Sequence, residues 1–270
     1  MSNKYVYLPV KCSKILRFLF ENRIASAKIV HAHLFPESHI RGINKHLKKL
    51  VDLEFIERRF ITNKDLRCLT LYSLTKKGFK YGLPELEEIK DAEIKSGKVR
   101  HDLMALNVRH RMSKLAGVNQ VWSENQIHFE SDYFEEEHFR DLSLIRADGA
   151  IEFDYNSKTH YAALEYEAST KTKARNKSKL GSYTYMRAIT VTLYVCKDKY
   201  IMNSLKNAER EYVKSNRREF SNIFYGLLDQ VLDESQAPYF ETIFGDKFID
   251  LSKAPESAFK PANDVQVEGN

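Results

Sequence analysis

The sequence contains few cysteines and no long apolar stretch. Its three cysteines, Cys12, Cys68 and Cys196, lie far apart and form no C-x-x-C pair, which is most simply explained by reduced thiols. No run approaches the roughly 18 apolar residues of a membrane span, and the N-terminus lacks the charged-then-apolar order of a signal peptide. We therefore expect a cytoplasmic protein with no membrane segment.

Positive charge is concentrated in the first third of the chain. Residues 1–83 contain 17 lysines and arginines against 6 acidic residues, whereas residues 84–270 contain 26 against 31. A basic module on an otherwise mildly acidic protein is the electrostatic pattern of a nucleic-acid binder. The alternative, a basic face without a nucleic-acid role, stays open.

Hydrophobic periodicity predicts a small helical module with a hairpin over residues 1–83. Apolar spacing typical of helices is followed by two strand-like runs that are joined by a turn at Asn63-Lys64-Asp65. We expect helices over residues 15–20, 25–34 and 38–53, and strands over residues 55–62 and 66–74. Three helices followed by a hairpin are typical of a winged helix-turn-helix domain.

The expected third helix carries a polar, basic face opposite its apolar residues. In a winged helix-turn-helix this helix enters the major groove, and the hairpin contacts phosphate groups. Candidate DNA-binding residues are Arg41, Asn44, Lys45 and Lys48 on the helix, of which the first three suit base edges, and Arg58, Arg59, Lys64 and Arg67 on the hairpin. A winged helix used for protein–protein contact is the alternative.

The rest of the chain alternates helical and strand-like segments. After a polar linker over residues 84–98, residues 99–253 predict an α/β domain with a mixed, partly parallel sheet, and residues 254–270 a disordered tail. Strands are expected within residues 119–124, 139–153, 160–168 and 189–196, the third holding two glutamates. A helix is expected between the last two strands, over residues 171–186.

Three carboxylates are predicted to converge on one side of that sheet. Glu165 and Glu167 lie two residues apart on one strand and therefore share a face, and Asp148 belongs to the strand paired with it. With the main-chain carbonyl of Tyr166 they offer oxygen ligands to Mg²⁺ or Mn²⁺. Asp148 as a simple strand start and Glu167 as a surface residue are the alternatives, whereas an unpaired Glu165 within an apolar strand would be costly to bury.

Short motifs in this order resemble the replication–relaxation family. The motifs are His101-Asp102 with Asn107, R-A-D-G-A around Asp148, A-L-E-Y-E around Glu165, and Lys179-Leu180 with Tyr183. The resemblance covers about residues 10–200 and implies a winged helix before a PD-(D/E)XK restriction-endonuclease-like domain. The family includes the MobC class of conjugative plasmid relaxases. Membership would imply cleavage of double-stranded DNA at a transfer origin, with relaxosome accessory or coupling proteins as partners.

One position departs from the common nuclease pattern. Restriction-type folds usually place a lysine two residues after the glutamate, where this chain has Glu167. A glutamate there can act as base or metal ligand, or the positive charge can come from the following helix, from Lys173, Arg175 or Lys179. Tyr183 and Tyr185 are candidate nucleophiles, with packing as the alternative. His101 is a candidate for orienting phosphate or acting as general acid.

These observations lead to one main functional hypothesis and two alternatives. The first is a metal-dependent DNA-nicking relaxase. The second is a non-catalytic DNA-binding protein, either a relaxosome or replication accessory factor or a repressor, on an inactive nuclease scaffold. The third is a transposition or defence endonuclease of the same fold.

Overall fold

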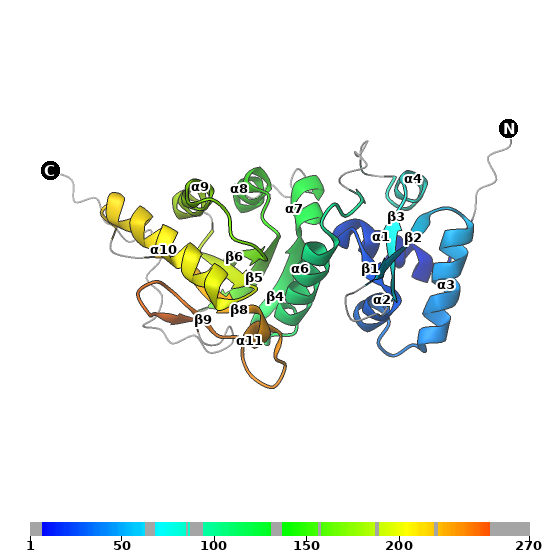
Figure 1. Cartoon of the computed structure of the whole chain (residues 1–270). Helices are drawn as coiled ribbons and strands as arrows, with labels where there is room; N and C mark the ends of the chain where they lie inside the picture. The colour runs from blue at the N-terminus through cyan, green and yellow to red at the C-terminus, as the bar shows by residue number, and fades with distance from the viewer. Residues whose placement is uncertain are drawn as a thin grey trace. The chain divides into compact units, whose positions relative to one another are not determined.

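The structure is a computed structural model that describes residues 7–62, 68–84, 86, 94–130, 137–155, 158–186, 189–218 and 221–248. It divides into two compact units, Met1–Leu103 and Met104–Asn270 (Figure 1). The boundary falls inside helix α6, Val99–Met112. Among the described residues, no helix has both the length and the apolar character needed to cross a bilayer.

The first unit consists of short helices and a small antiparallel sheet. Its strands follow the order β1-β3-β2, with β2 and β3 forming a hairpin. The elements are α1 Val10–Asn22, β1 Ala25–Ser26, α2 Ala27–Leu34, α3 Ile40–Asp52, β2 Ile56–Thr62, β3 Cys68–Leu74 and α4 Lys76–Gly82. The turn predicted at residues 63–65 lies outside the described residues.

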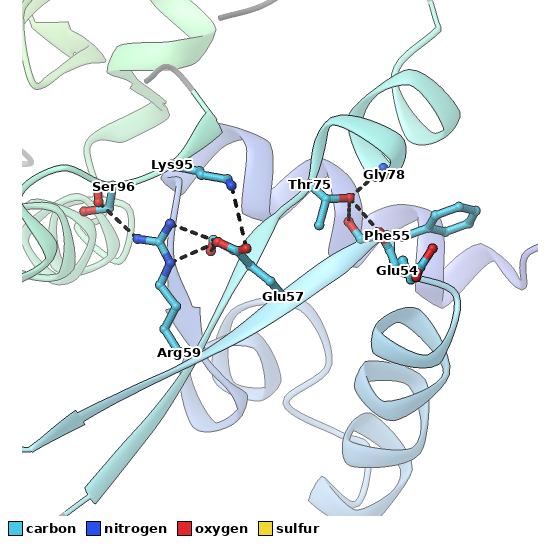
Figure 2. A network of polar contacts seen from close by, with 9 residues as sticks. Glu54, Phe55, Glu57, Arg59, Thr75, Gly78, Lys95 and Ser96 are labelled. Carbon is cyan, nitrogen blue, oxygen red and sulfur yellow. Dashed lines mark hydrogen bonds and ion pairs between the residues drawn. The ribbon is translucent and has the colours of Figure 1, made fainter. Parts of the chain in front are cut away.

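Local capping explains where the helices of this unit begin. The Ser26 side chain accepts a hydrogen bond from Ile29 N at the start of α2, and His39 does the same for Arg41 N at the start of α3. The N-cap of the third helix is therefore His39, one residue after the predicted N-cap Ser38. Thr75 caps α4 by accepting from Gly78 N and donates to the Phe55 carbonyl (Figure 2).

The second unit is built on a seven-stranded mixed sheet in the order β10-β9-β8-β7-β6-β5-β4. The strands are β4 Val118–Ser123, β5 Gly149–Tyr155, β6 Lys158–Glu167, β7 Val191–Cys196, β8 Ile223–Leu227, β9 Phe240–Glu241 and β10 Lys247–Phe248. Strands β6, β7 and β8 are parallel, and the pairs on either side are antiparallel. The predicted mixed α/β architecture is thus confirmed.

Helices cover both faces of this sheet. Besides α6, they are α7 Glu124–Glu130, α8 Glu137–Ile145, α9 Lys173–Tyr185, α10 Lys199–Ser215 and α11 Leu228–Leu232. Buried residues of α7, α8, α9 and α10 pack in one cluster, which contains Ala163 of β6. Those of α6 and α11 pack in the other, which contains Leu164 and Tyr166. The two faces of β6 therefore alternate as the sequence predicts.

One predicted strand region is partly helical. Residues 137–145 form α8, which buries Phe139 and Leu142, so the strand preceding the hairpin begins only at Gly149. The helix ends because Arg146 adopts a φ of 52°, and Ala147 N donates to the Leu142 carbonyl. Asp148 consequently lies in the turn before β5 rather than inside the strand.

Candidate active site

Asp148 lies immediately before the first residue of β5, at the sheet edge where the neighbouring strand β6 continues. Gly149 pairs with Leu164, and beyond that pair β6 runs on through Glu165 and Tyr166. The Asp148 carboxylate accepts a hydrogen bond from Tyr166 N at 2.8 Å. The Asp148 side chain thereby accepts from a main-chain N–H just beyond the last β5–β6 pair. This bond fixes the orientation of the carboxylate beside β6.

A buried arginine holds the Asp148 turn from the α6 side of the sheet. Arg109 is 9% exposed, and its Nη1 donates to the Asp148 carbonyl at 2.7 Å. A Cβ atom on Gly149 would lie 2.8 Å from the Trp122 carbonyl oxygen and 3.1 Å from Arg109 Cδ, so glycine permits this close approach. Arg109 was not among the site residues predicted from the sequence. Arg109 lies three residues from both Leu106 and Met112, which places a cation on the buried face of the helix. This spacing could have identified it from the sequence.

Glu165 is the buried carboxylate at the centre of the cluster. It is 3% exposed, and its Oε2 accepts from Lys179 Nζ of α9 at 2.5 Å. Its Oε1 accepts from the Tyr183 hydroxyl. Burial raises the pKa of Glu165 to about 7, the Lys179 ammonium opposes that rise, and the Asp148 charge adds to it. Glu165 therefore titrates near neutral pH.

Lys179 and Tyr183 come from successive turns of α9 and face the same carboxylate. Burial acts to lower the pKa of Lys179, but Glu165 and Asp148 outweigh it and raise that pKa. The Lys179 side chain remains 37% exposed, although its ammonium is paired with Glu165. Tyr183 is fully buried, and burial together with Glu165 raises its pKa well above the ordinary value. Its hydroxyl is thus neutral and enclosed.

Glu167, the residue that departs from the common nuclease pattern, has partners of its own. It accepts from Ser169 N at 3.3 Å and pairs with Lys171 Nζ at 3.1 Å. Of the three cations predicted to replace the lysine, Lys179 contacts Glu165, whereas Lys173 pairs with Glu211. Arg175 is exposed on α9.

The oxygen donors suit a hard divalent cation but do not form a three-carboxylate group. Within the part of the chain that the structure describes, no three His, Cys, Asp or Glu side chains gather as a metal site. Glu167 therefore does not complete the predicted convergence. Asp148 and Glu165 interact electrostatically, and the Tyr166 carbonyl lies between Glu165 and Glu167 on the same strand. A cation held here would take a main-chain oxygen in place of the third carboxylate.

Two catalytic candidates predicted from the sequence remain, His101 and Tyr185. His101 belongs to the first unit, where its Nδ1 lies 3.4 Å from Asp102 Oδ1. The side chain of Tyr185 lies outside the described residues.

Most of the described DNA-binding candidates are exposed in the first unit. On α3, Ile43, Leu47 and Leu50 are buried. The opposite face exposes Arg41, Asn44, Lys45 and Lys48, as predicted for an amphipathic helix. On the hairpin, Lys64 and Arg67 lie outside the described residues.

The two adjacent arginines of β2 have different environments. Arg58 is exposed. Arg59 instead donates to Glu57 Oε1 at 3.0 and 2.9 Å and to the Ser96 carbonyl at 3.3 Å, and Lys95 lies 3.7 Å from Glu57 Oε2 (Figure 2). Arg59 therefore ties β2 to the segment before α6, and its guanidinium is already engaged rather than presented to phosphate.

Comparisons with known proteins identify a family. The sequence model of the replication-relaxation family matches residues 16–194. No curated protein matches the chain. Among solved structures, a cysteine-to-serine mutant of Lactococcus lactis ZitR in complex with DNA aligns at 28% identity over 30% of this chain and 53% of its own, with a TM-score of 0.25. The restriction endonuclease FokI aligns at 8% identity over 86% and 45%, with a TM-score of 0.23. The chain thus spans about half of each structure, and both TM-scores are too low to show a shared fold.

Proposed function

Because the chain belongs to the replication-relaxation family, we propose that it is a DNA-nicking relaxase of the MobC class, which cleaves a plasmid transfer origin with Mg²⁺ or Mn²⁺. The observation that carries the proposal is the cluster of Asp148, Glu165 and Lys179. In this proposal the two carboxylates hold a divalent cation, and the lysine stabilises negative charge on the phosphodiester that is cleaved. In this proposal the second unit is a PD-(D/E)XK restriction-endonuclease-like domain.

The first unit acts in this proposal as a winged helix-turn-helix that selects the DNA. Three helices precede the β2–β3 hairpin, and α3 presents an exposed basic face. Arg41, Asn44 and Lys45 have the donors and acceptors that read base edges, and Lys48 supplies charge for phosphate. The excess of basic residues over residues 1–83 supports this role.

Asp148, Glu165 and the Tyr166 carbonyl would hold the divalent cation. When bound, such a cation polarises the scissile phosphodiester and lowers the pKa of a water molecule. The chain's own contribution is orientation, because Arg109 and Tyr166 N hold Asp148, and Lys179 and Tyr183 hold Glu165. In this proposal Lys179, whose side chain is partly exposed, stabilises negative charge that develops on a phosphate.

Water is the nucleophile in this proposal, and Tyr183 has a supporting role. The Tyr183 hydroxyl is buried, donates to Glu165 and has a raised pKa, so it is poorly suited to attack DNA. A covalent tyrosyl–DNA link through Tyr185 is the alternative that the experiment below distinguishes.

A non-catalytic role is the second candidate, and one feature favours it. Both Glu165 oxygens accept protein hydrogen bonds, and Glu167 is paired with Lys171. A site closed in this way is also what an inactive nuclease scaffold would show. The chain would then bind DNA as a relaxosome or replication accessory factor or as a repressor.

A plasmid-nicking assay separates the two candidates. A supercoiled plasmid that carries the gene of this chain with its flanking DNA is incubated in Mg²⁺ or Mn²⁺ with the wild type, Asp148→Asn or Glu165→Gln. Asparagine retains an oxygen that can accept from Tyr166 N, so Asp148→Asn removes charge while preserving the turn. The relaxase proposal predicts metal-dependent nicking that both variants lose. DNA binding without nicking in either metal would favour the accessory role, and a protease-sensitive DNA end would identify a tyrosine nucleophile.

A further inference from the structure

The β2 strand presents two faces with opposite character. Side chains alternate along a strand, so Arg58 and Phe60 share one face, and Glu57 and Arg59 share the other. On β3, Tyr72 lies opposite Arg58 and Thr70 lies opposite Phe60, which extends the first face across the hairpin.

The Glu57–Arg59 face is closed by contacts within the first unit. Glu57 accepts from Arg59 and from the Ser73 hydroxyl at 3.2 Å, and Arg59 reaches the Ser96 carbonyl (Figure 2). Ser73 is fully buried. This side of the hairpin therefore supports the segment before α6.

The Arg58–Phe60 face is open. Phe60 is 66% exposed, and Arg58 is exposed without an ion pair among the residues that the structure describes. The two side chains leave the same face about 7 Å apart along the strand. An exposed phenylalanine beside a guanidinium offers an apolar ring and a positive charge to one partner.

DNA is the partner whose chemistry fits this face. The unit that contains it has 17 basic and 6 acidic residues within positions 1–83, which attract a polyanion. An arginine is drawn to the negative potential of the minor groove, and an apolar side chain can enter between base pairs and kink the duplex by about 20–90°. An acidic protein surface would pair with Arg58 but would make no use of the Phe60 ring.

We propose that the Arg58–Phe60 face binds the minor groove of double-stranded DNA, with Phe60 inserted between two base pairs and Arg58 in the groove beside it. This inference rests on the proposed DNA-binding role of the first unit but not on cleavage. The consequence is a bent duplex, which would unstack base pairs near the protein. Pyrimidine–purine steps are the sequences that such a wedge enters at least cost.

DNA bending provides the test. Duplexes of about 30 base pairs with a central TA step carry a donor and an acceptor dye on their ends, and energy transfer is measured with the full chain in the absence of divalent metal. The variants are Phe60→Ala, Arg58→Gln and Leu69→Ala. Leu69 is the matched control, because it is 43% exposed and pairs with Ile61, on the opposite face of the same hairpin.

We expect the wild type to bend the duplex and Phe60→Ala to lose at least half of the bend, with affinity reduced by about 3- to 10-fold. Arg58→Gln should lower the slope of log affinity against log salt by about 0.9. Leu69→Ala should bend DNA as the wild type does. Phe60→Trp should retain the bend and show fluorescence quenching on binding, because the indole would stack on bases.

A straight complex with bound wild type, or a bend that persists in Phe60→Ala, would overturn the inference while leaving DNA binding intact. Self-association that disappears in Phe60→Ala, with DNA binding unchanged, would also overturn it and assign the face to a protein contact. Bending in this assay, combined with no nicking in the plasmid assay with Mg²⁺ or Mn²⁺, would support the inference and count against the proposed relaxase activity.

Discussion

The folded second unit should lose stability as pH rises from about 5 to 8, and Glu165 should be one cause. Burial and the Asp148 charge raise the pKa of Glu165 from 4.5 to about 7, although Lys179 opposes the rise. A carboxyl with a raised folded-state pKa holds its proton more tightly in the folded chain. Its stabilising contribution is therefore complete below pH 4.5 and is lost as pH rises through about 7.

The size of this effect follows from the shift. One pKa unit corresponds to about 1.4 kcal/mol, so the shift corresponds to about 3 kcal/mol of unfolding free energy. Glutamine at position 165 cannot ionise, so the stability of the wild type relative to Glu165→Gln should fall by about that amount between pH 5 and 8. Using the difference between the two proteins cancels the contribution of all other titrating groups that the substitution leaves unchanged.

Urea unfolding followed by tryptophan fluorescence suits the measurement. The chain has one tryptophan, Trp122, which is 4% exposed in the second unit and packs in the cluster that contains Tyr183. Glu209→Gln tests the same reasoning at a second place in that unit, because burial also raises the pKa of Glu209 to about 7. The reasoning would be refuted if the unfolding free energy of the wild type relative to Glu165→Gln stayed constant or rose as pH increases. It would mean that the Lys179 ion pair keeps Glu165 ionised.

Three further substitutions test single contacts. Tyr183→Phe should lower the free energy of unfolding by about 1–2 kcal/mol and still permit plasmid nicking, because the hydroxyl holds Glu165 rather than attacking DNA. Complete loss of cleavage in a folded variant would contradict this. Arg109→Lys should lower the melting temperature, because it releases the Asp148 turn. It should also reduce nicking by about 10-fold or more, since displacing a catalytic group has an effect of that order. Gly78→Ala should unfold the first unit, since its Cβ would lie 1.9 Å from the main-chain oxygen of Phe55. Thermal unfolding followed by circular dichroism tests this, and a melting curve like that of the wild type would refute the contact.

Periodicity accounts for much of what could be predicted from the sequence. The alternation in β6 correctly placed Ala163 opposite Leu164 and Tyr166, and the amphipathic pattern of α3 correctly separated buried from exposed residues. Both predictions depend on spacing within one element, which local geometry determines. The mixed sheet was predicted from one strand that is apolar on both faces and lies between helices, and this strand is β7.

Contacts between distant segments were beyond such reasoning. Both Arg58 and Arg59 were predicted to contact phosphate, and the contacts of Arg59 with Glu57 and with Ser96, 37 residues away, distinguish them. Arg109 and Asp148 lie 39 residues apart and meet because α6 packs beneath the turn before β5. The choice of Lys179 among three cations of α9 likewise depended on which face of that helix packs against β6. Tertiary packing, rather than propensity, decides all three.

The most direct test of the account is the rate at which wild type and Asp148→Asn nick supercoiled plasmid as Mn²⁺ is increased. Asp148 has its main-chain hydrogen bond at one carboxylate oxygen, and asparagine preserves an acceptor there while removing the charge. We predict that wild-type cleavage rises with Mn²⁺ to a plateau and disappears in chelator, whereas the folded variant shows no cleavage at any concentration. Equal cleavage by the two proteins, or wild-type cleavage that persists in chelator, would contradict a metal-dependent site at Asp148 and Glu165.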